Sequence, residues 1–543
     1  MVKEIRKLGI PDYIGIQTEK AQFWGKPEQG SAQTEDVEVT VEQGEENDAV
    51  MLHAKYSAVK WVKLHWNMEI SSNARIFADE WERGYGNMEW KGMNPNRMFP
   101  WYFLHYGEET KVVWGAGVMV RPGAMCQWLM NTKGITLYLD VRCGGAGVHL
   151  KGRTLCAARI VSREFSQCTV FEAARAFCRA MCPDPVFPEK PVYGSNNWYY
   201  AYGDSSQKEI LRDTDYLCRL TKGLENPPFM VVDDCWQEHH RLEDYNGGPW
   251  RKGNAKFPDM KGLADAIKER GARPGIWVRF LLNEDEAIKP EWRLSHNGCL
   301  DPSHPEARAY IRQDMETICK WGYELVKHDF STFDLFGKWG FQMNPLVTSD
   351  GWSFYDRTKT SAEIVTDFYQ MIWDVAKEYQ VIIIGCNTIG HLGAGLMQLN
   401  RIGDDTSGKR WERTRQLGVN SLAFRLMQHR TFYDIDADCV GIAGAISWEK
   451  NRQWSRLLAK SGTPFFLSAV PDLLDEEQEK ELAGFLEIAS KQEIHVVPCD
   501  WLTNSCPEIW SDGETTETYD WYEEKGMEFD YESIRYTMMQ YAD

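Results

Sequence analysis

Hydrophobic and polar residues follow two different rhythms along this chain. Up to about Glu172, short segments alternate between the two kinds and are separated by Gly, Asn and Pro, as in E-D-V-E-V-T-V-E and G-I-T-L-Y-L-D-V. Alternation with a period of two places successive side chains on opposite faces of a strand. The first part of the chain is therefore predicted to be a large antiparallel β-sandwich.

A helix and a proline-rich connector separate this part from the next. The pattern F-E-A-A-R-A-F-C-R-A-M-C predicts a helix near Phe171 to Cys182, and four prolines follow between Pro183 and Pro191. So many prolines can neither continue a helix nor fill a central strand. We predict a domain boundary here, with an N-terminal domain over residues 1–185 that includes the helix.

After the connector, apolar strands alternate with amphipathic helices. The candidate strands are 192–200, 229–236, 274–280, 324–330, 381–387, 399–405, 432–441 and 464–469. Helical stretches such as Met260 to Gly271 and Thr360 to Tyr379 lie between most of them. Eight strand and helix units in a row predict a chain of the α/β class with a (β/α)8 TIM barrel over residues 186–490. Segments such as E-I-H-V-V-P predict a small C-terminal β region over 491–543.

The fourth candidate strand, Y-E-L-V-K-H-D-F, ends in charged residues. In an extended strand Lys327 and Asp329 share one face, and His328 points to the other, where the helical layer of a barrel would lie. The helix before it is predicted to begin with a capping box formed by Ser303 and Glu306. Gly322 is predicted to end that helix.

Composition and charge narrow the range of functions. The net charge of -19 argues against nucleic acid or an anionic membrane surface as a partner, and no apolar run approaches the length of a membrane span. Trp, Tyr and Phe make up 13% of the chain, which fits a carbohydrate site, where aromatic faces pack on sugar C–H surfaces, and fits a large β-rich core as well.

The 14 cysteines are scattered and show no zinc-binding spacing, so no metal or other cofactor is expected. The N-terminus M-V-K-E-I-R-K-L-G-I-P lacks the apolar region of a signal peptide. We therefore expect a cytoplasmic protein with free thiols. A segment rich in aromatic and acidic residues, Asp79 to Trp90, fits a loop packed on its own β-domain or part of a site, and the packed loop is the preferred interpretation.

Polar and aromatic residues gather at the predicted C-terminal ends of the barrel strands, the face on which barrel enzymes carry their active sites. They are Trp198, Asp233, Asp234, Trp277, Lys327, Asp329, Cys386, Arg401, Asp404 and Asp405. Several carboxylates beside a lysine, an arginine and two tryptophans suit glycoside hydrolysis, in which one carboxylate attacks the anomeric carbon and a second protonates the leaving oxygen.

Five motifs along the barrel resemble those of a known family. V-V-D-D-C-W, P-G-I-W-V, L-V-K-H-D-F, I-G-C-N and R-I-G-D-D-T-S are similar to successive strand-end motifs of the α-galactosidases of glycoside hydrolase family 36, over about Tyr193 to Trp411. The resemblance implies a retaining exo-α-galactosidase that acts on terminal α-D-galactosyl residues through a covalent glycosyl-enzyme. It also implies a small carbohydrate substrate and the possibility of a homo-oligomer.

The same resemblance implies roles for individual residues. Asp329 would be the nucleophile, and Asp405, four residues after Arg401, the acid/base. Lys327 would bind a ring hydroxyl and help to keep Asp329 ionised. Because a general acid must hold its proton near neutral pH, we expect Asp405 to lie in a less polar setting than Asp329.

The remaining members of the group would bind the sugar. Asp233 and Asp234 would accept hydrogen bonds on the O4 and O6 side, which both can do only if the strand has ended before them. Trp198 and Trp277 would form apolar walls. Cys386 matches a family cysteine near the 2-hydroxyl, but it is equally well explained as a small buried hydrophobic residue.

Some positions depart from the family pattern and leave alternatives open. Arg279 stands where the family more often has a proline, and the loop after Cys386 lacks the usual glycine-rich sequence. Asp404 is adjacent to Asp405, so either could be the acid/base. An α-N-acetylgalactosaminidase, another α-glycosidase or transglycosylase, and a non-catalytic carbohydrate-binding protein remain alternatives, and the aglycone and oligomeric state stay open.

Overall fold

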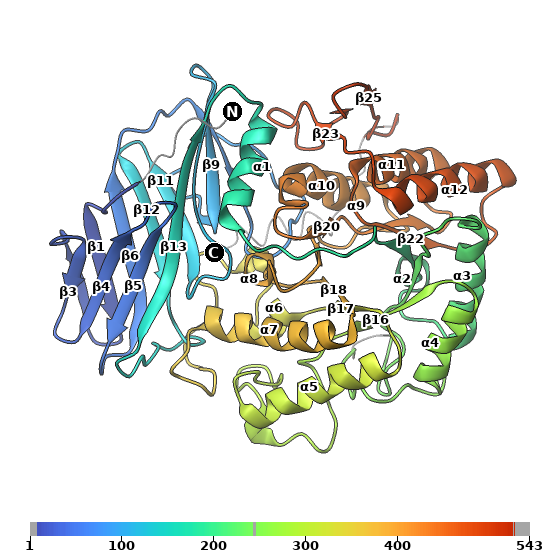
Figure 1. Ribbon diagram of the computed structural model, residues 1–543, viewed down its shortest axis with the longest axis horizontal. Coiled ribbons are helices and arrows are strands. Elements are labelled where there is room, and N and C mark those ends of the chain that lie inside the picture. The colour runs from blue at the N-terminus through green and yellow to red at the C-terminus, as the bar shows by residue number, and fades with distance from the viewer. Residues whose placement is uncertain (1–7, 243–245, 525, 527–543) are drawn as a thin grey trace.

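A β-sandwich lies beside a (β/α)8 barrel in the computed structural model, which describes residues 8–242, 246–524 and 526 (Figure 1). The predicted fold class is confirmed. The seven N-terminal residues, on which the prediction of no signal peptide partly rests, and most of the chain after 524 lie outside the described residues. No helix in the described ranges is long and apolar enough to cross a membrane.

The sandwich consists of two antiparallel sheets. Their strand orders are β2-β1-β6-β12-β11-β8 and β3-β4-β5-β13-β10-β9-β7. The strands are β1 (Tyr13–Thr18), β2 (Gln22–Gly25), β3 (Ser31–Gln33), β4 (Val37–Gln43), β5 (Asp48–Ala54), β6 (Val59–Asn67), β7 (Ala74–Ala78), β8 (Phe99–Pro100), β9 (Tyr102–Gly107), β10 (Val112–Val118), β11 (Met125–Asn131), β12 (Gly134–Asp140) and β13 (Thr154–Phe165). In β4, Val37, Val39 and Val41 are buried and alternate with less buried residues, as the sequence pattern predicted.

Helix α1 (Val170–Met181) connects the sandwich to the barrel and lies between them in Figure 1. Thr169 and Glu172 form a capping box at its start. Cys178 and Cys182 are both buried there. All 14 cysteines of the chain are free thiols.

The barrel is one parallel sheet with the order β20-β19-β18-β17-β16-β15-β14-β22-β21. Its strands are β14 (Tyr193–Asn196), β15 (Phe229–Val232), β16 (Arg273–Val278), β17 (Leu325–His328), β18 (Ile382–Gly385), β19 (Leu399–Arg401), β20 (Asp434–Asp436), β21 (Cys439–Ile442) and β22 (Phe465–Ala469). The two edge strands β20 and β21 are consecutive in the chain, so they are halves of one barrel strand and the sheet closes on itself. The break falls at Asp438, whose φ is 74°.

Helices cover the outside of this sheet (Figure 1). The α-helices are α2 (Trp198–Ala201), α3 (Gln207–Leu220), α4 (Met260–Glu269), α5 (Pro305–Lys320), α6 (Ser331–Phe336), α7 (Ser361–Tyr379), α8 (Gly390–Gly393), α9 (Trp411–Thr414), α10 (Asn420–Arg425), α11 (Trp448–Ser461) and α12 (Glu476–Lys491). Short helical turns η1 (Pro290–Trp292), η2 (Gly340–Gln342), η3 (Arg415–Val419) and η4 (Leu426–Gln428) complete the set.

Two local predictions for the start of α5 and the end of β14 are wrong. The N-cap of α5 is His304, because the Ser303 hydroxyl donates to Asp301 Oδ1 at 2.7 Å and is not available to the helix. Strand β14 ends at Asn196, and Trp198 begins the short helix α2 instead of continuing the strand. The predicted stop at Gly322 is confirmed, since Trp321 is the C-cap and Gly322 has a φ of 93°.

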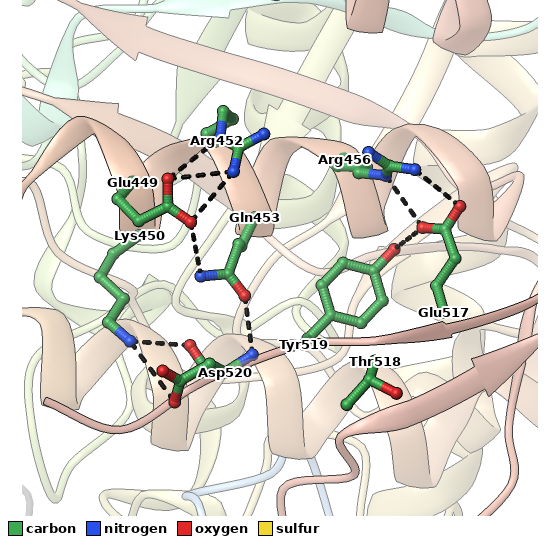
Figure 2. A pocket seen from close by; sticks show the side chains of 9 residues that line it. All are labelled: Glu449, Lys450, Arg452, Gln453, Arg456, Glu517, Thr518, Tyr519 and Asp520. Carbon is green, nitrogen blue, oxygen red and sulfur yellow. Dashed lines mark hydrogen bonds and ion pairs between the residues drawn. The ribbon is translucent and has the colours of Figure 1, made fainter. Parts of the chain in front are cut away.

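The C-terminal region forms a three-stranded sheet, β23 (Val497–Pro498), β24 (Ile509–Ser511) and β25 (Thr516–Thr518). Side chains of α11 bind the end of this region (Figure 2). Lys450 Nζ donates to the carbonyl oxygen of Asp520 at 2.7 Å, and Arg456 pairs with Glu517 at 2.9 Å. The pocket between them is lined by paired charges and contains none of the predicted site residues.

Candidate functional site

The inner face of the barrel explains why the predicted residues meet. One buried cluster contains Phe229 and Val231 of β15, Leu325 of β17, Ile382 and Ile384 of β18, Leu399 of β19, and Cys439 of β21. Every second residue along a strand points to the same face, so the next inward positions are Asp233, Lys327, Cys386 and Arg401. The apolar floor of the barrel thus gives way to polar groups one layer above it, at the C-terminal ends of the strands.

Lys327 and Asp233 form a buried ion pair across β17 and β15. Lys327 Nζ lies 2.8 Å from Asp233 Oδ2, and the residues are 9% and 3% exposed. Burial acts to lower the pKa of Lys327, but the negative charges around it, led by the Asp233 carboxylate, together outweigh burial and raise that pKa well above its ordinary value. Asp329 also acts to raise this pKa, and Arg401 acts to lower it. The lysine is therefore a fixed cation in the middle of the group.

Asp329 is held by two donors. Trp277 Nε1 donates to its Oδ2 at 2.9 Å, and the backbone N–H of Phe330 donates to its Oδ1 at 2.6 Å. Phe330 has a φ of 63°, a left-handed conformation that costs a non-glycine residue about 1 kcal/mol or more. This turn directs the N–H of Phe330 at the carboxylate. Trp277 is more than an apolar wall, because it donates a hydrogen bond to Asp329.

Arg401 links the two sides of the site. Its Nη2 lies 2.9 Å from Asp438 Oδ2 and 3.1 Å from Asp405 Oδ1, and its Nη1 lies 3.8 Å from Cys386 Sγ. The break between β20 and β21 places Asp438 at this position. Burial raises the pKa of the Cys386 thiol well above its ordinary value, so the residue is a neutral thiol at the site. Its contact with Arg401 places it among the polar groups.

The segment Asp79 to Trp90 does not pack only on its own domain, and that prediction is wrong. Gly84 forms a parallel bridge with Gly403: its N–H donates to the carbonyl of Ile402 at 2.7 Å, and its carbonyl accepts from Asp404 N at 2.9 Å. A side chain at Gly403 would lie 2.3 Å from the carbonyl oxygen of Leu417, so only glycine permits the close packing of this position against Leu417. The β-sandwich thus reaches into the mouth of the barrel.

This segment brings Arg83 to the two adjacent acids. Arg83 Nη2 lies 2.9 Å from Asp404 Oδ1, and its Nη1 lies 3.8 Å from Asp405 Oδ1. Arg413 Nη2 holds the other oxygen of Asp404 at 3.3 Å. Asp404 is 4% exposed and lies between two guanidinium groups, whereas the side chain of Asp405 is 41% exposed. The two neighbouring carboxylates therefore have clearly different surroundings.

The expectation that Asp405 lies in a less polar setting than Asp329 is wrong. Enclosure by the site acts to raise the pKa of Asp405. Four cations together outweigh this effect and hold the pKa well below its ordinary value: in order of decreasing effect, Arg401, Arg83, Lys327 and Arg413. Three of these cations lie around Asp405 because other acids bind them. Asp438 pairs with Arg401, and Asp404 pairs with both Arg83 and Arg413. The lowered pKa favours the ionised form of Asp405, so a general acid at this position would have to take up a proton when substrate binds.

The other predicted residues lie around this centre. Asp234 follows the end of β15 and contacts Gln237 Nε2 at 2.6 Å and His240 Nδ1 at 3.3 Å, so it faces away from Lys327. Trp198 is half-buried and packs against the inner barrel cluster. Both acids after β15 thus lie beyond the strand end, which was the condition for both to line a pocket.

His328 and Arg279 lie beside the site and contact other partners instead of the charged residues at its centre. His328 packs on Phe280 and on Phe368 of α7, with ring centroids 5.7 and 5.4 Å apart, so the prediction that it faces the helical layer is confirmed. Burial lowers its pKa to about 4. Arg279, at a position that departs from the family pattern, pairs with Asp334 at 2.6 Å.

Sequence reasoning missed three residues of the site: Arg83, Asp438 and Asp436. Asp436 pairs in register with Arg401, and burial raises its pKa to about 6. The alternating acids in D-I-D-A-D could have identified Asp436 and Asp438 as inward residues at a strand end. No local signal singled out Arg83 within its segment, because its partners lie more than 300 residues away in the chain.

Comparison with known proteins supports the assignment of the fold. No family model matches the chain. A sequence match to an α-galactosidase of Oryza sativa subsp. japonica is 28% identical over 140 residues, which is 26% of this chain and 29% of that protein. The match thus spans less than a third of the curated relative.

Solved structures match over much more of the chain. An α-galactosidase of Thermus thermophilus, solved in complex with p-nitrophenyl α-D-galactopyranoside, has a TM-score of 0.61 and 16% identity over 93% of this chain and 99% of that one. The fold is that of these α-galactosidases. A family 36 α-galactosidase of Geobacillus stearothermophilus has a TM-score of 0.59 and 12% identity over 93% of this chain and 79% of its own. The resemblance to family 36 seen in the motifs is confirmed at the level of the fold.

Proposed function

We propose that this α-galactosidase-like protein is a retaining glycoside hydrolase that removes terminal α-D-galactosyl residues from oligosaccharides or glycoconjugates. The observation that carries the proposal is a pair of dissimilar carboxylates at the C-terminal ends of the barrel strands: Asp329, held by Trp277 and Phe330, and the half-exposed Asp405 on Arg401. The sequence match to a plant α-galactosidase and the shared fold support the choice of sugar.

Asp329 is the nucleophile of the proposed reaction. Its two donors orient the carboxylate and stabilise its charge, and the neighbouring cation Lys327 does the same. In the first step an oxygen of Asp329 bonds to the anomeric carbon while the bond from that carbon to the leaving oxygen breaks. The leaving oxygen takes a proton from the acid/base residue.

Asp405 is a better candidate for the acid/base than Asp404. Among the described residues, the side-chain partners of Asp405 are Arg401 and Arg83, and both contact Oδ1, so Oδ2 is available to substrate. Both oxygens of Asp404 are taken by guanidinium groups. In the second step the Asp405 carboxylate accepts a proton from water, the water oxygen bonds to the anomeric carbon, and the bond to Asp329 breaks with overall retention.

Binding of the sugar falls to the residues around this pair. Lys327 and Asp233 form a donor and acceptor unit that can bind two adjacent hydroxyls, and Trp198 supplies an apolar face. Cytoplasmic location and assembly into a homo-oligomer remain predictions from the sequence.

A panel of aryl α-glycosides tests the proposal. We expect hydrolysis of p-nitrophenyl α-galactoside to exceed that of the α-N-acetylgalactosaminide, α-glucoside and β-arabinopyranoside, with the α-anomer of galactose as the first product detected by NMR. Asp329→Asn should abolish turnover and leave the circular dichroism spectrum unchanged, because one carboxylate oxygen is needed as nucleophile. A preference for the N-acetylgalactosaminide would change the sugar, and hydrolysis of no glycoside would favour a binding protein.

A further inference from the structure

We propose that Arg83, which the β-sandwich domain delivers to the mouth of the barrel, is a positioning residue for the acid/base carboxylate Asp405. The inference rests on the proposed function and adds a role for the first domain. Arg83 is 7% exposed and contacts both adjacent acids, with Nη2 2.9 Å from Asp404 Oδ1 and Nη1 3.8 Å from Asp405 Oδ1.

The segment that carries Arg83 is rigidly attached to the barrel. Beyond the bridge between Gly84 and Gly403, Arg425 of α10 donates to Asp79 Oδ1 at 3.0 Å and to the carbonyl of Glu82 at 2.6 Å. Glu82 Oε2 accepts from Gly340 N at 2.8 Å. These bonds bracket Arg83 on both sides, so its guanidinium has a fixed position relative to the acids.

The position of Arg83 has two effects on Asp405. By pairing with Asp404, it keeps the like charge of that neighbour compensated. It lies 3.8 Å from Oδ1 of Asp405, the same oxygen that Arg401 binds, so both cations favour an orientation of the carboxylate in which Oδ2 is available to substrate. A cation at this distance also favours the ionised form of Asp405, and Arg83 is the second-largest of the charges that lower its pKa.

Asp405 is surrounded by charged and titratable groups from six parts of the chain. They are Arg401 of β19, Lys327 of β17, Arg413 of α9, Asp438 between β20 and β21, Tyr199 of α2, and the neighbour Asp404 with Arg83. Arg401 and Arg83 are each paired with a second acid, Asp438 and Asp404 respectively, and both still lower the pKa of Asp405. Removing the charge of Arg83 should raise the pKa of Asp405.

The test compares pH profiles of kcat/KM for two galactosides. Methyl α-galactoside has a poor leaving group and needs the protonated acid, whereas p-nitrophenyl α-galactoside needs little assistance. For methyl α-galactoside, Arg83→Met should move the alkaline limb of the profile upward by roughly 1–2 pH units. Arg83→Lys, which keeps the charge, should restore most of the original position.

Tyr85→Phe is a matched control from the same segment. It removes the hydrogen bond from the Tyr85 hydroxyl to Glu82 Oε2 and keeps the charge of Arg83. We expect the alkaline limb to stay in place in this variant. Equal shifts in Tyr85→Phe and Arg83→Met would assign the effect to loosening of the segment and overturn the inference.

A second variant keeps the inference testable if Arg83→Met does not fold. Asp404→Asn removes a like charge and frees Arg83 to move toward Asp405, so the alkaline limb should move to lower pH. An unchanged limb in folded Arg83→Met, or in Asp404→Asn, would overturn the role of Arg83. If the wild-type protein hydrolyses neither galactoside, the proposed function fails instead, so the two failures are distinguishable.

Discussion

Removing the charge of Lys327 should destabilise the barrel strongly and in a pH-dependent way. Two unit charges 2.8 Å apart attract by about 6 kcal/mol at an effective dielectric constant of about 20, and part of this offsets the cost of burying them. Lys327→Met leaves Asp233, 3% exposed, as an uncompensated buried carboxylate. Removing one partner of a buried ion pair lowers the free energy of unfolding by about 3–5 kcal/mol. We expect a loss of this size near pH 7.

The pH dependence follows from Asp233. Burial already raises its pKa, and Lys327 opposes that rise, so the variant should raise the pKa further. A folded state that binds the proton more tightly than the unfolded chain gains stability as pH falls through its raised pKa toward about 3.9. The difference in the free energy of unfolding between wild type and Lys327→Met should therefore become smaller from pH 7 to pH 4.5.

Urea unfolding followed by tryptophan fluorescence at several pH values measures this deficit. The double variant Lys327→Met with Asp233→Asn should recover most of the loss, because the second change removes the stranded charge. Lys261→Met is the matched control, since Lys261 pairs with Asp265 at 2.7 Å on an exposed face and its loss should leave the midpoint unchanged. A deficit below about 1 kcal/mol at pH 7, or one that does not vary with pH, would refute the reasoning.

Further variants separate the two adjacent acids and test the buried histidine. Asp405→Ala should slow methyl α-galactoside far more than p-nitrophenyl α-galactoside in steady-state kinetics; that leaving-group dependence in Asp404→Ala instead would exchange the two assignments. Because burial lowers the pKa of His328 to about 4, the unfolded chain takes up its proton first, and stability should fall from about pH 6.5 toward pH 4. His328→Phe fits between Phe280 and Phe368 and should flatten this decline in urea midpoints; an equally steep decline would contradict it.

Local patterns in the sequence were enough to predict the barrel and much of its site. Alternation along the fourth strand placed Lys327 and Asp329 inward and His328 outward, because strand geometry is set by the backbone itself. Ends of elements were predicted less well. Ser303 fits a capping box in sequence, but Asp301 competes for its hydroxyl, and the apolar run through Trp198 turns into a helix at the end of β14.

What the sequence could not show is the set of contacts made over long distances. Arg83 lies in a segment that the sequence predicts to pack on its own β-domain, and only the folded chain brings it to Asp404 and Asp405. The setting of Asp405 was predicted incorrectly for the same reason. The proton affinity of a carboxylate depends on the sum of charges around it, and those charges come from both domains.

The bridge between Gly84 and Gly403 joins positions 319 residues apart, so it closes one of the longest loops in the chain. Contacts of such high sequence separation form late, because the entropy of the intervening chain must be lost before they stabilise anything. The strands of the barrel can assemble from neighbouring units, but the setting of Asp405 is complete only when the first and last thirds of the protein meet. During refolding, recovery of activity should therefore lag behind recovery of secondary structure.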